Sequence, residues 1–219
     1  MKQLIEKLTI ELDDCRRILD LGVGTGRFSG PLQKVGFEVA GIDLSRKMTS
    51  KAKEKNVRDL LLADARSIPF KDKIFDATVS VHILHLVKEW QKTLAEVCRV
   101  TRHAMLSLYY ARKDPVGAKY DLLLKPYGFE RHRPGKSEQD LRDLVTPTKT
   151  VFVCSYCTSA DDRITNLQQG TSSSQWEIPK QVNLEAVDKL KMEFAGKTFR
   201  QDLYFSVWEI DSLKVCIEK

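Results

Sequence analysis

The chain has 219 residues and a formal net charge of +6 at neutral pH, with 42% hydrophobic and 30% charged residues. This is the composition of an ordinary folded protein with a substantial core. No apolar run of about 18 residues is present, so a membrane-spanning helix is excluded and we expect no membrane association. The first residues are too charged for a secretory signal. Five cysteines without framework spacing fit a reducing compartment, so we predict a cytoplasmic protein.

Basic residues gather in two stretches, 46–55 and 131–136. In the first stretch they recur at helical spacing, which favours a solvated helix face. The second stretch contains Arg131, His132 and Arg133 beside Pro134-Gly135, in an expected loop that could meet an anionic substrate or RNA. A modest positive charge of this kind does not decide between these partners.

Strands and helices alternate between residues 17 and 110. Apolar runs predict five strands, at Arg17–Leu21, Phe37–Asp43, Asp59–Ala63, Phe75–Val81 and Ala104–Tyr110. Helices are expected between them, at Phe28–Lys34, Ser45–Lys55 and Val87–Val100, with Ser45 as an N-cap. Alternation with short connections predicts an α/β fold, in which helices cover both faces of a parallel sheet.

The pattern changes after Tyr110. Residues 111–136 are rich in Lys, Arg, Pro and Gly, and a capping box runs from Ser137 to Asp140. Further on we expect a strand at Val151–Tyr156, a helix at Asn183–Ala195 and a last strand at Leu203–Ile210. No repeat or convincing linker divides the chain. We therefore predict one domain, 1–219, in which residues 111–147 and 159–198 are substrate-side insertions or a cap.

Three glycines follow the first strand, in Asp20-Leu-Gly-Val-Gly-Thr-Gly26. A glycine costs about 0.5–1 kcal/mol relative to alanine inside an element, so the cluster needs a reason. In an open parallel sheet, ligands bind beyond the carboxyl ends of the strands, where this loop falls. The spacing departs from the dinucleotide pattern G-x-G-x-x-G/A, because the register that starts at Gly24 ends in Ser29. Asp20 would repel a pyrophosphate but suit an ammonium group, which argues against NAD.

Two more acids end neighbouring strands. Asp43 ends the second strand, where a carboxylate can accept both ribose hydroxyls. Asp64 ends the third strand, where it can accept the exocyclic amine of adenine, with the Ala65 N–H nearby. An acid for an ammonium group, one for a ribose and one for an adenine together describe S-adenosylmethionine.

The segments ILDLGVGTGRF, GIDLSRKM, LLADARSIPFKDKIFDATVSVHILHLV and KTLAEVCRV closely resemble class I S-adenosylmethionine-dependent methyltransferases. The nearest resemblance is to the small-molecule group that includes ubiquinone- and menaquinone-pathway enzymes. It is dense over residues 15–110 and weaker afterwards. It implies a Rossmann-like, doubly wound, mostly parallel seven-stranded sheet with helices on both faces and an antiparallel last strand.

The resemblance also implies a role for individual residues. The residues expected to bind the cofactor, S-adenosyl-L-methionine, are Asp20, Gly22, Gly24, Gly26, Asp43, Leu44, Met48, Asp64, Ala65 and Ser80. His82 would lie beside the transferred methyl group, and no metal is expected. Two features depart from the family pattern. About 17 residues precede the first strand, fewer than in such enzymes, and Thr101-Arg-His-Ala104 replaces a Lys-Pro-Gly-Gly turn.

Methyl transfer from a sulfonium is an in-line displacement, in which alignment supplies most of the acceleration. A base is needed only where the acceptor must lose a proton. The predicted catalytic residues are His82 and Tyr109, whereas His85 is better explained by packing on a helix stripe. Residues expected to line an acceptor pocket are Arg163, Gln168, Gln175 and Trp176.

Several alternatives stay open beside a small-molecule methyltransferase. A tRNA or rRNA methyltransferase would use the basic loop at 131–133, although Ser80-Val-His-Ile83 lacks the Asn/Asp-Pro-Pro-aromatic motif of base-amine methyltransferases. A non-catalytic cofactor-binding protein is a third class. Cys154 and Cys157 have C-x-x-C spacing, but no second pair completes a zinc site. The sequence does not indicate the acceptor, the methylated atom or the oligomeric state.

Overall fold

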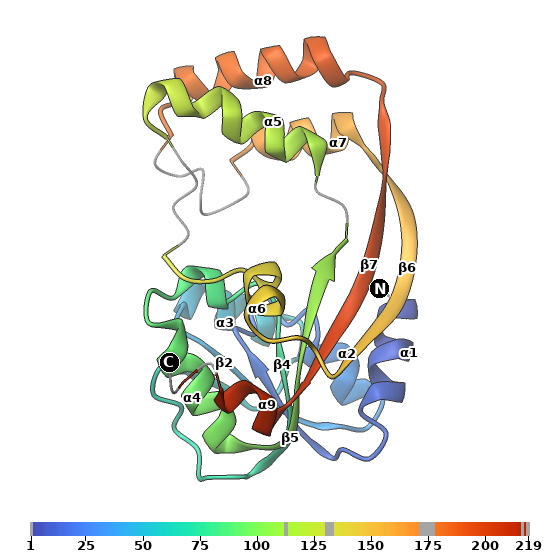
Figure 1. Cartoon of the computed structure of the whole chain (residues 1–219), viewed down its shortest axis with the longest axis vertical. Coiled ribbons are helices and arrows are strands. Elements are labelled where there is room, and N and C mark those ends of the chain that lie inside the picture. Colours follow the sequence, from blue (N-terminus) through green and yellow to red (C-terminus); the bar gives the residue numbers. More distant parts are fainter. Residues whose placement is uncertain (1, 112–113, 130–133, 171–177, 216, 218–219) are drawn as a thin grey trace. The chain divides into compact units, whose positions relative to one another are not determined.

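The structure is a computed structural model that describes residues 2–111, 114–129, 134–170, 178–215 and 217 (Figure 1). Its contacts divide the chain into two compact units. Unit 1 comprises Met1–Tyr109, Arg133–Val153 and Tyr204–Lys219, and unit 2 comprises Tyr110–His132 and Cys154–Leu203. Of the expected insertions, residues 111–132 and 159–198 lie in unit 2, whereas 133–147 lie in unit 1.

Seven strands form one sheet in the order β3-β2-β1-β4-β5-β7-β6. They are β1 Arg17–Leu21, β2 Glu38–Asp43, β3 Leu60–Leu62, β4 Phe75–Ser80, β5 Thr101–Tyr110, β6 Lys149–Ser159 and β7 Thr198–Glu209. β1 pairs in parallel with β2 and β4, and the parallel pairs β2–β3 and β4–β5 extend the sheet. The last strand, β7, runs antiparallel to its neighbours (Figure 1). The fold predicted from the sequence is confirmed, and the strand order reverses between β1 and β4.

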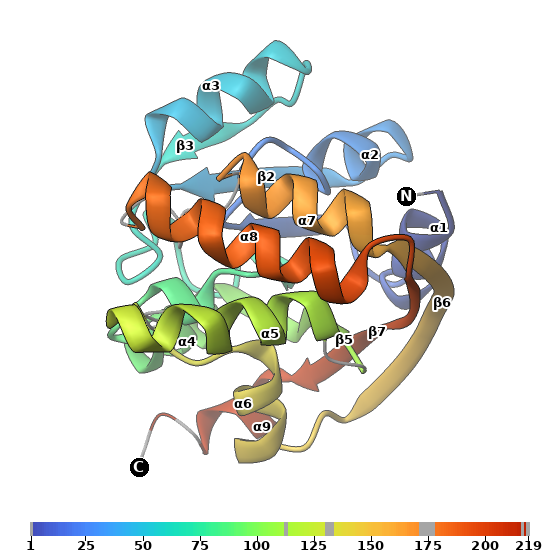
Figure 2. The same cartoon turned by 90° about the horizontal axis from the view of Figure 1, so that it is seen from above.

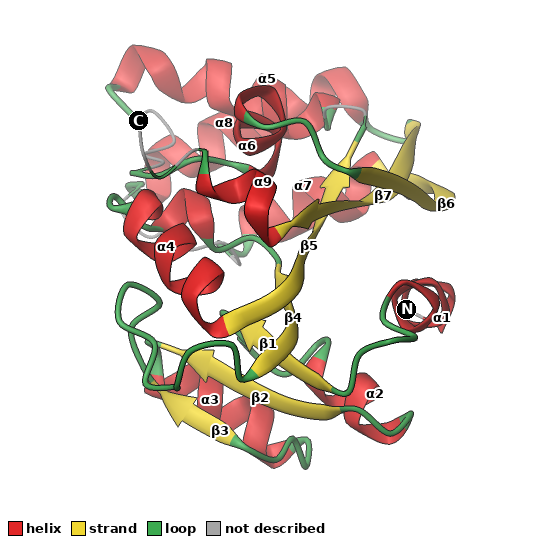
Figure 3. Ribbon diagram, turned by 60° about the horizontal axis from the view of Figure 1, so that its bottom comes forward, coloured by secondary structure: helices red, strands yellow, loops and turns green. Residues whose placement is uncertain are grey.

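Helices cover both faces of the sheet in unit 1, with α4 and α9 on one side and α2 and α3 on the other (Figure 3). The helices of this unit are α1 Lys2–Glu11, α2 Ser29–Lys34, α3 Arg46–Glu54, α4 Trp90–Val100, α6 Glu138–Leu144 and α9 Ile210–Lys214. The main core lies under α4, where Leu19, Leu94 and Met105 are fully buried. α4 begins at Trp90 instead of the expected Val87, because the short 3₁₀ turn η1 (Leu84–Leu86) comes first. His85 therefore lies in this turn and is half-buried, and the packing expected for its side chain stays a prediction.

Unit 2 is built from three helices that pack on one another (Figure 2). They are α5 Pro115–Leu124, α7 Ala160–Gln168 and α8 Lys180–Phe194, with the 3₁₀ turn η2 Lys125–Tyr127 after α5. Their shared core includes Tyr120, Ile164 and Val187. Only α8 was predicted. α5 was missed because Pro115 and Gly117 read as loop signals, although Asp114 caps the helix and accepts the Gly117 N–H.

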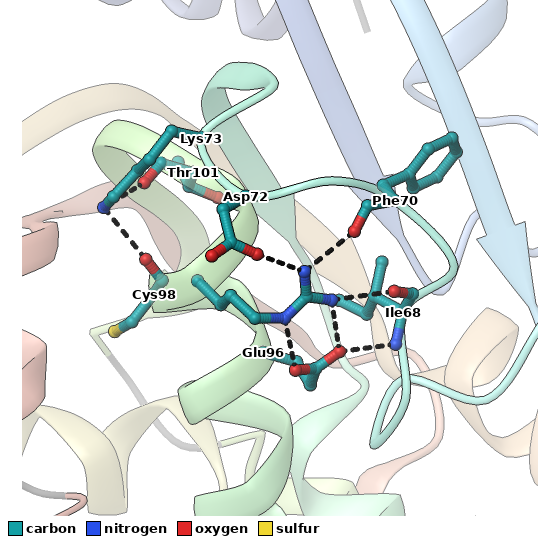
Figure 4. A network of polar contacts seen from close by, with 8 residues as sticks. Ile68, Phe70, Asp72, Lys73, Glu96, Cys98 and Thr101 are labelled. Atoms are coloured by element: carbon teal, nitrogen blue, oxygen red, sulfur yellow. Dashed lines mark hydrogen bonds and ion pairs between the residues drawn. The ribbon is translucent and has the colours of Figure 1, made fainter.

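The connection between β3 and β4 is held by one guanidinium group, that of Arg99 on α4 (Figure 4). The oxygens that accept its hydrogen bonds, at 2.7–2.8 Å, belong to Ile68, Phe70, Asp72 and Glu96. The Lys73 ammonium adds a second anchor, because it donates to the carbonyl oxygens of Cys98 and Thr101. The Arg99 bonds satisfy the carbonyl groups of Ile68 and Phe70 in the irregular connection between β3 and β4. Together with the Lys73 bond to Cys98, they tie this connection to α4.

Gly26 and Gly36 both have positive φ but differ in the space around them. Substituting each by alanine therefore distinguishes the cost of backbone strain from the cost of crowding a new Cβ. Gly26 has φ +75° and a Cβ there would lie 2.5 Å from Val57 Cγ2, whereas Gly36 has φ +105° and open space around it. We expect Gly36→Ala to lower the free energy of unfolding by about 1–2 kcal/mol through strain alone. Gly26→Ala should lose about 1–3 kcal/mol more through overpacking. Urea unfolding of both variants measures the difference, and equal losses would refute the packing argument.

Candidate functional site

The glycine loop after β1 has the left-handed backbone that only glycine adopts readily. Gly22, Gly24 and Gly26 have φ values of +74°, +53° and +75°. A Cβ at Gly22 would also lie 2.7 Å from Ile83 Cδ1. The glycines are therefore explained both by the turn and by close contacts with neighbouring side chains.

Asp43 joins this loop to the next one. At the end of β2, its Oδ2 accepts the Gly24 N–H at 2.9 Å, and its Oδ1 accepts the Ser45 N–H at 2.8 Å. Its side chain is half-buried, and each carboxylate oxygen has acceptor capacity for a further bond. Leu44 follows with 72% of its surface exposed, and Met48 is half-buried on α3. Asp43 thus contacts the glycine loop, while Leu44 follows it in sequence and the Met48 N–H donates to the Ser45 hydroxyl; their expected roles toward a cofactor stay predictions.

Asp20 is buried at the end of β1, with 3% of its surface exposed. Its Oδ2 accepts both the Ser29 N–H at 3.1 Å and the Ser29 hydroxyl at 2.6 Å, at the start of α2. Burial raises the pKa of Asp20 to about 6, and the charge of Asp43 adds to the rise. Sequence reasoning missed this contact with Ser29. The expected contact of Asp20 with an ammonium group stays a prediction.

Asp64 is paired with a neighbour two residues along the chain. The Arg66 guanidinium donates to both Asp64 oxygens and, through Nη1, to Glu89 at 2.7 Å. Hydrogen bonds from the Arg66 side chain hold the pKa of Asp64 below its usual range. Ala65, between them, is buried with 7% exposed. The expected role of Asp64 toward adenine stays a prediction. The adenine amine would compete with Arg66 for the same carboxylate.

Ser80 ends β4 beside Leu21 of β1. Its side chain is 2% exposed, and its hydroxyl has no hydrogen-bond partner among the residues that the structure describes. A buried hydroxyl without a partner calls for an explanation, and a bound ligand or water supplies one. Ser80 thus lies at the carboxyl edge of the sheet, and its expected role toward a cofactor stays a prediction.

His82 lies just beyond β4 with a left-handed backbone, φ +58°. Its N–H donates to Glu138 Oε1 at 2.6 Å, and its Nδ1 lies 3.5 Å from the same oxygen. Glu138 is 8% exposed. Burial raises the pKa of Glu138, but the hydrogen bonds and charge of His82 outweigh it and leave that pKa below the usual range. Glu138 was not predicted, since nothing local in the sequence connects residues 56 positions apart.

Tyr109, near the end of β5, lies between two side chains of unit 1. Its ring stacks on that of Tyr204 at 5.3 Å between centroids, and the Arg142 guanidinium lies 3.8 Å from its centroid. These contacts describe a packed aromatic ring. The catalytic role expected for Tyr109 stays a prediction.

Other predicted residues lie in unit 2 or outside the described residues. Arg163 on α7 donates to Asp114, and Gln168 ends α7. The residues that lie outside the described part of the chain are Arg131, His132, Arg133, Gln175 and Trp176. Among the described residues, no group of three or more His, Cys, Asp or Glu side chains could hold a metal ion.

A cleft of about 550 Å³ opens at the other edge of the sheet, by the amino ends of β1 and β2. Arg17, Glu38, Arg58 and Phe75 are among the residues that line it, and none of the predicted site residues does. Because ligands of open α/β sheets bind beyond the carboxyl ends of the strands, we place the candidate site at the glycine loop. No helix in the described part of the chain is long and apolar enough to cross a membrane.

This chain is similar to known proteins in sequence and in fold. Residues 19–104 match the model of a methyltransferase domain family. The phosphatidylethanolamine N-methyltransferase of Cereibacter sphaeroides is 35% identical over 113 residues, 47% of this chain and 55% of that protein. The demethylmenaquinone methyltransferase of Renibacterium salmoninarum is 38% identical over 88 residues, 40% of this chain and 37% of that protein. The chain thus spans about half or less of the length of these relatives.

The crystal structure of the YcgJ protein from Bacillus subtilis covers 93% of this chain and 96% of its own, with a TM-score of 0.57 and 21% sequence identity. At this identity the likeness shows the fold alone. Residues 19–104 are thus similar to a methyltransferase domain family, and the relatives named above are methyltransferases.

The buried Asp20 carboxyl predicts a pH-dependent stability. Its pKa rises from 3.8 in the unfolded chain to about 6 in the folded protein, so ionisation is harder after folding. The stability it contributes is full below about pH 4 and is lost as the pH rises through about 6. Relative to Asp20→Asn, wild-type protein should therefore lose up to about 3 kcal/mol of unfolding free energy between about pH 4 and 7.

Urea unfolding at a series of pH values measures this loss. The exposed Asp13→Asn is the matched control, and its stability should follow the wild-type curve. Parallel curves for wild type and Asp20→Asn would show that the buried carboxyl does not titrate in this range.

Proposed function

We propose that the protein is an S-adenosylmethionine-dependent methyltransferase that transfers a methyl group to a small-molecule acceptor. The observation that carries the proposal is the position of Asp43, whose carboxylate ends β2 beside a loop of left-handed glycines. The family match over residues 19–104 supports it. Because the match covers less than half of the chain, the activity of the whole protein is part of the proposal.

The residues present fit this cofactor. The Gly22 and Gly24 backbones carry no side chain that would fill the loop, and the buried Ser80 hydroxyl has acceptor and donor capacity to offer. Asp43 would accept the ribose hydroxyls, and the exposed Leu44 would cover one face of the adenine. When bound, S-adenosylmethionine supplies a methyl group on a sulfonium, which is an electrophile with a good leaving group.

The protein's own contribution is then mainly orientation. Groups held on strand ends keep the cofactor site rigid, and effective concentrations gained by alignment account for about 7–11 kcal/mol in well-oriented reactions. The loop after β4, which contains His82, approaches the glycine loop closely, since Ile83 fills the space beside Gly22. A side chain at this position can contact the acceptor as well as the cofactor.

A small-molecule acceptor is favoured by the relatives. Two of them are named as a phosphatidylethanolamine N-methyltransferase and a demethylmenaquinone methyltransferase. The similarity covers 47% and 40% of this chain, so the acceptor of this chain is not carried over. The basic loop at 131–133, which an RNA acceptor would need, lies outside the described part of the chain.

Asp43→Ala tests the proposed ribose contact. Removing a charged acceptor of two hydroxyls should weaken S-adenosylmethionine binding by about 1.5–3 kcal/mol, a ten- to hundredfold loss. Isothermal titration calorimetry measures the affinity, and circular dichroism checks the fold. Glu54→Gln removes an exposed carboxylate from the end of α3 and should bind like wild type. Unchanged affinity in Asp43→Ala would remove the proposed site.

Ser80→Ala tests whether the Ser80 hydroxyl serves ligand binding or the stability of the fold. Its hydroxyl makes no described hydrogen bond, so its removal should leave stability unchanged or raise it by about 1 kcal/mol. The same variant should bind S-adenosylmethionine more weakly. Thr93→Val on α4 is the control, because Thr93 is fully buried with an equally unpartnered hydroxyl. It should keep wild-type affinity, and a Ser80→Ala variant with wild-type affinity would show that this hydroxyl is not part of the site.

A further inference from the structure

One buried carboxylate faces a histidine at the end of β4. Glu138 Oε1 accepts the His82 N–H at 2.6 Å and lies 3.5 Å from Nδ1 of the same residue. A single oxygen thus contacts both the backbone and the ring. The ring contact is longer than an ordinary hydrogen bond, as contacts of general bases often are before the acceptor binds.

The carboxylate is held rigidly. It begins α6, whose first turn is closed by a capping box between Ser137 and Asp140. The residues before it pack against the turn that follows His82, since a Cβ on Gly135 would lie 2.0 Å from Leu84 O. Leu141 in the same helix is fully buried in the main core. Glu138 therefore has little freedom to leave His82.

The His82 side chain is partly exposed, whereas the side chain of Glu138 is buried. About 45% of the His82 side chain is accessible, against 11% for that of Glu138. The His82 backbone has φ +58°, which costs about 1 kcal/mol in a residue with a Cβ. Glu138 from α6 faces the ring, and the ring of His85 from η1 lies 6.4 Å away between centroids.

We propose that Glu138 is a positioning residue that holds the His82 imidazole as the Nδ1–H tautomer, so that Nε2 is a base for the methyl acceptor. A carboxylate beside one ring nitrogen stabilises the proton on that nitrogen, so the other nitrogen keeps a lone pair that can accept a proton. The acceptor is then an O–H or S–H group. Its proton forms a bond to Nε2, the electron pair of the O–H or S–H bond stays on the acceptor atom, and the imidazolium is stabilised by Glu138.

The base role rests on the proposed function, but the tautomer can be tested without it. Full-length protein carrying ¹⁵N-labelled histidine is studied by NMR at a pH where the imidazoles are neutral, with His82→Asn to assign the resonances. In wild type, Nδ1 of His82 should carry the proton and Nε2 should not. Glu138→Gln keeps an acceptor oxygen and should keep this preference. Glu138→Met removes the acceptor and should shift the ring toward the Nε2–H tautomer that free histidine prefers.

Asp143→Asn is the matched control, because Asp143 is exposed on the same helix and its loss should leave the tautomer unchanged. The proposal is overturned if wild-type His82 carries its proton on Nε2, or if Glu138→Met leaves the tautomer as in wild type. The wild-type spectrum decides the point even where Glu138→Met fails to fold. Calorimetric titration of wild type with S-adenosylmethionine is the separate test of the proposed function, and absent binding there would leave the Glu138–His82 pair standing.

Discussion

The carboxylate of Asp43 is the interaction on which the candidate site depends. It accepts one N–H from the glycine loop after β1 and one from the cap of α3, so one side chain sets the positions of two neighbouring loops. Backbone N–H groups at such turns are obligatory donors that need a partner. The same oxygens keep lone pairs directed away from these bonds. Asp43 can therefore brace the turn and accept further hydrogen bonds from a ligand.

The other two acids at the strand ends are used within the protein. Asp20 is buried against the start of α2, and Asp64 is bound by the Arg66 guanidinium. The roles expected for Asp20 and Asp64 toward a ligand stay predictions, in which each carboxylate also keeps or exchanges a partner within the protein. Asp43 differs from them because both of its described partners are backbone N–H groups, and because it has an exposed apolar neighbour in Leu44. The candidate site is built around this residue, with the buried Ser80 hydroxyl as a second polar group.

Local patterns predicted most of unit 1. The strands up to Tyr110 and the Ser45 cap were predicted because each depends on residues close in sequence, through periodicity or a hydrogen bond within one turn. The pairings of Asp20 with Ser29 and of Glu138 with His82 depend on how elements fold together, and no local pattern carries them. α5 and α7 were missed because their stability comes from packing in a separate core, which overrides weak local signals.

The central claim is that an adenosyl ligand binds at the carboxyl edge of the sheet with its ribose on Asp43. A crystal structure of the protein grown with S-adenosylhomocysteine, the product that such a reaction leaves, tests it most directly. We expect electron density in which both ribose hydroxyls lie within hydrogen-bond distance of the Asp43 carboxylate. Density for the ligand in the cleft lined by Arg17 and Arg58 at the opposite edge, with none beside the glycine loop, would contradict the claim.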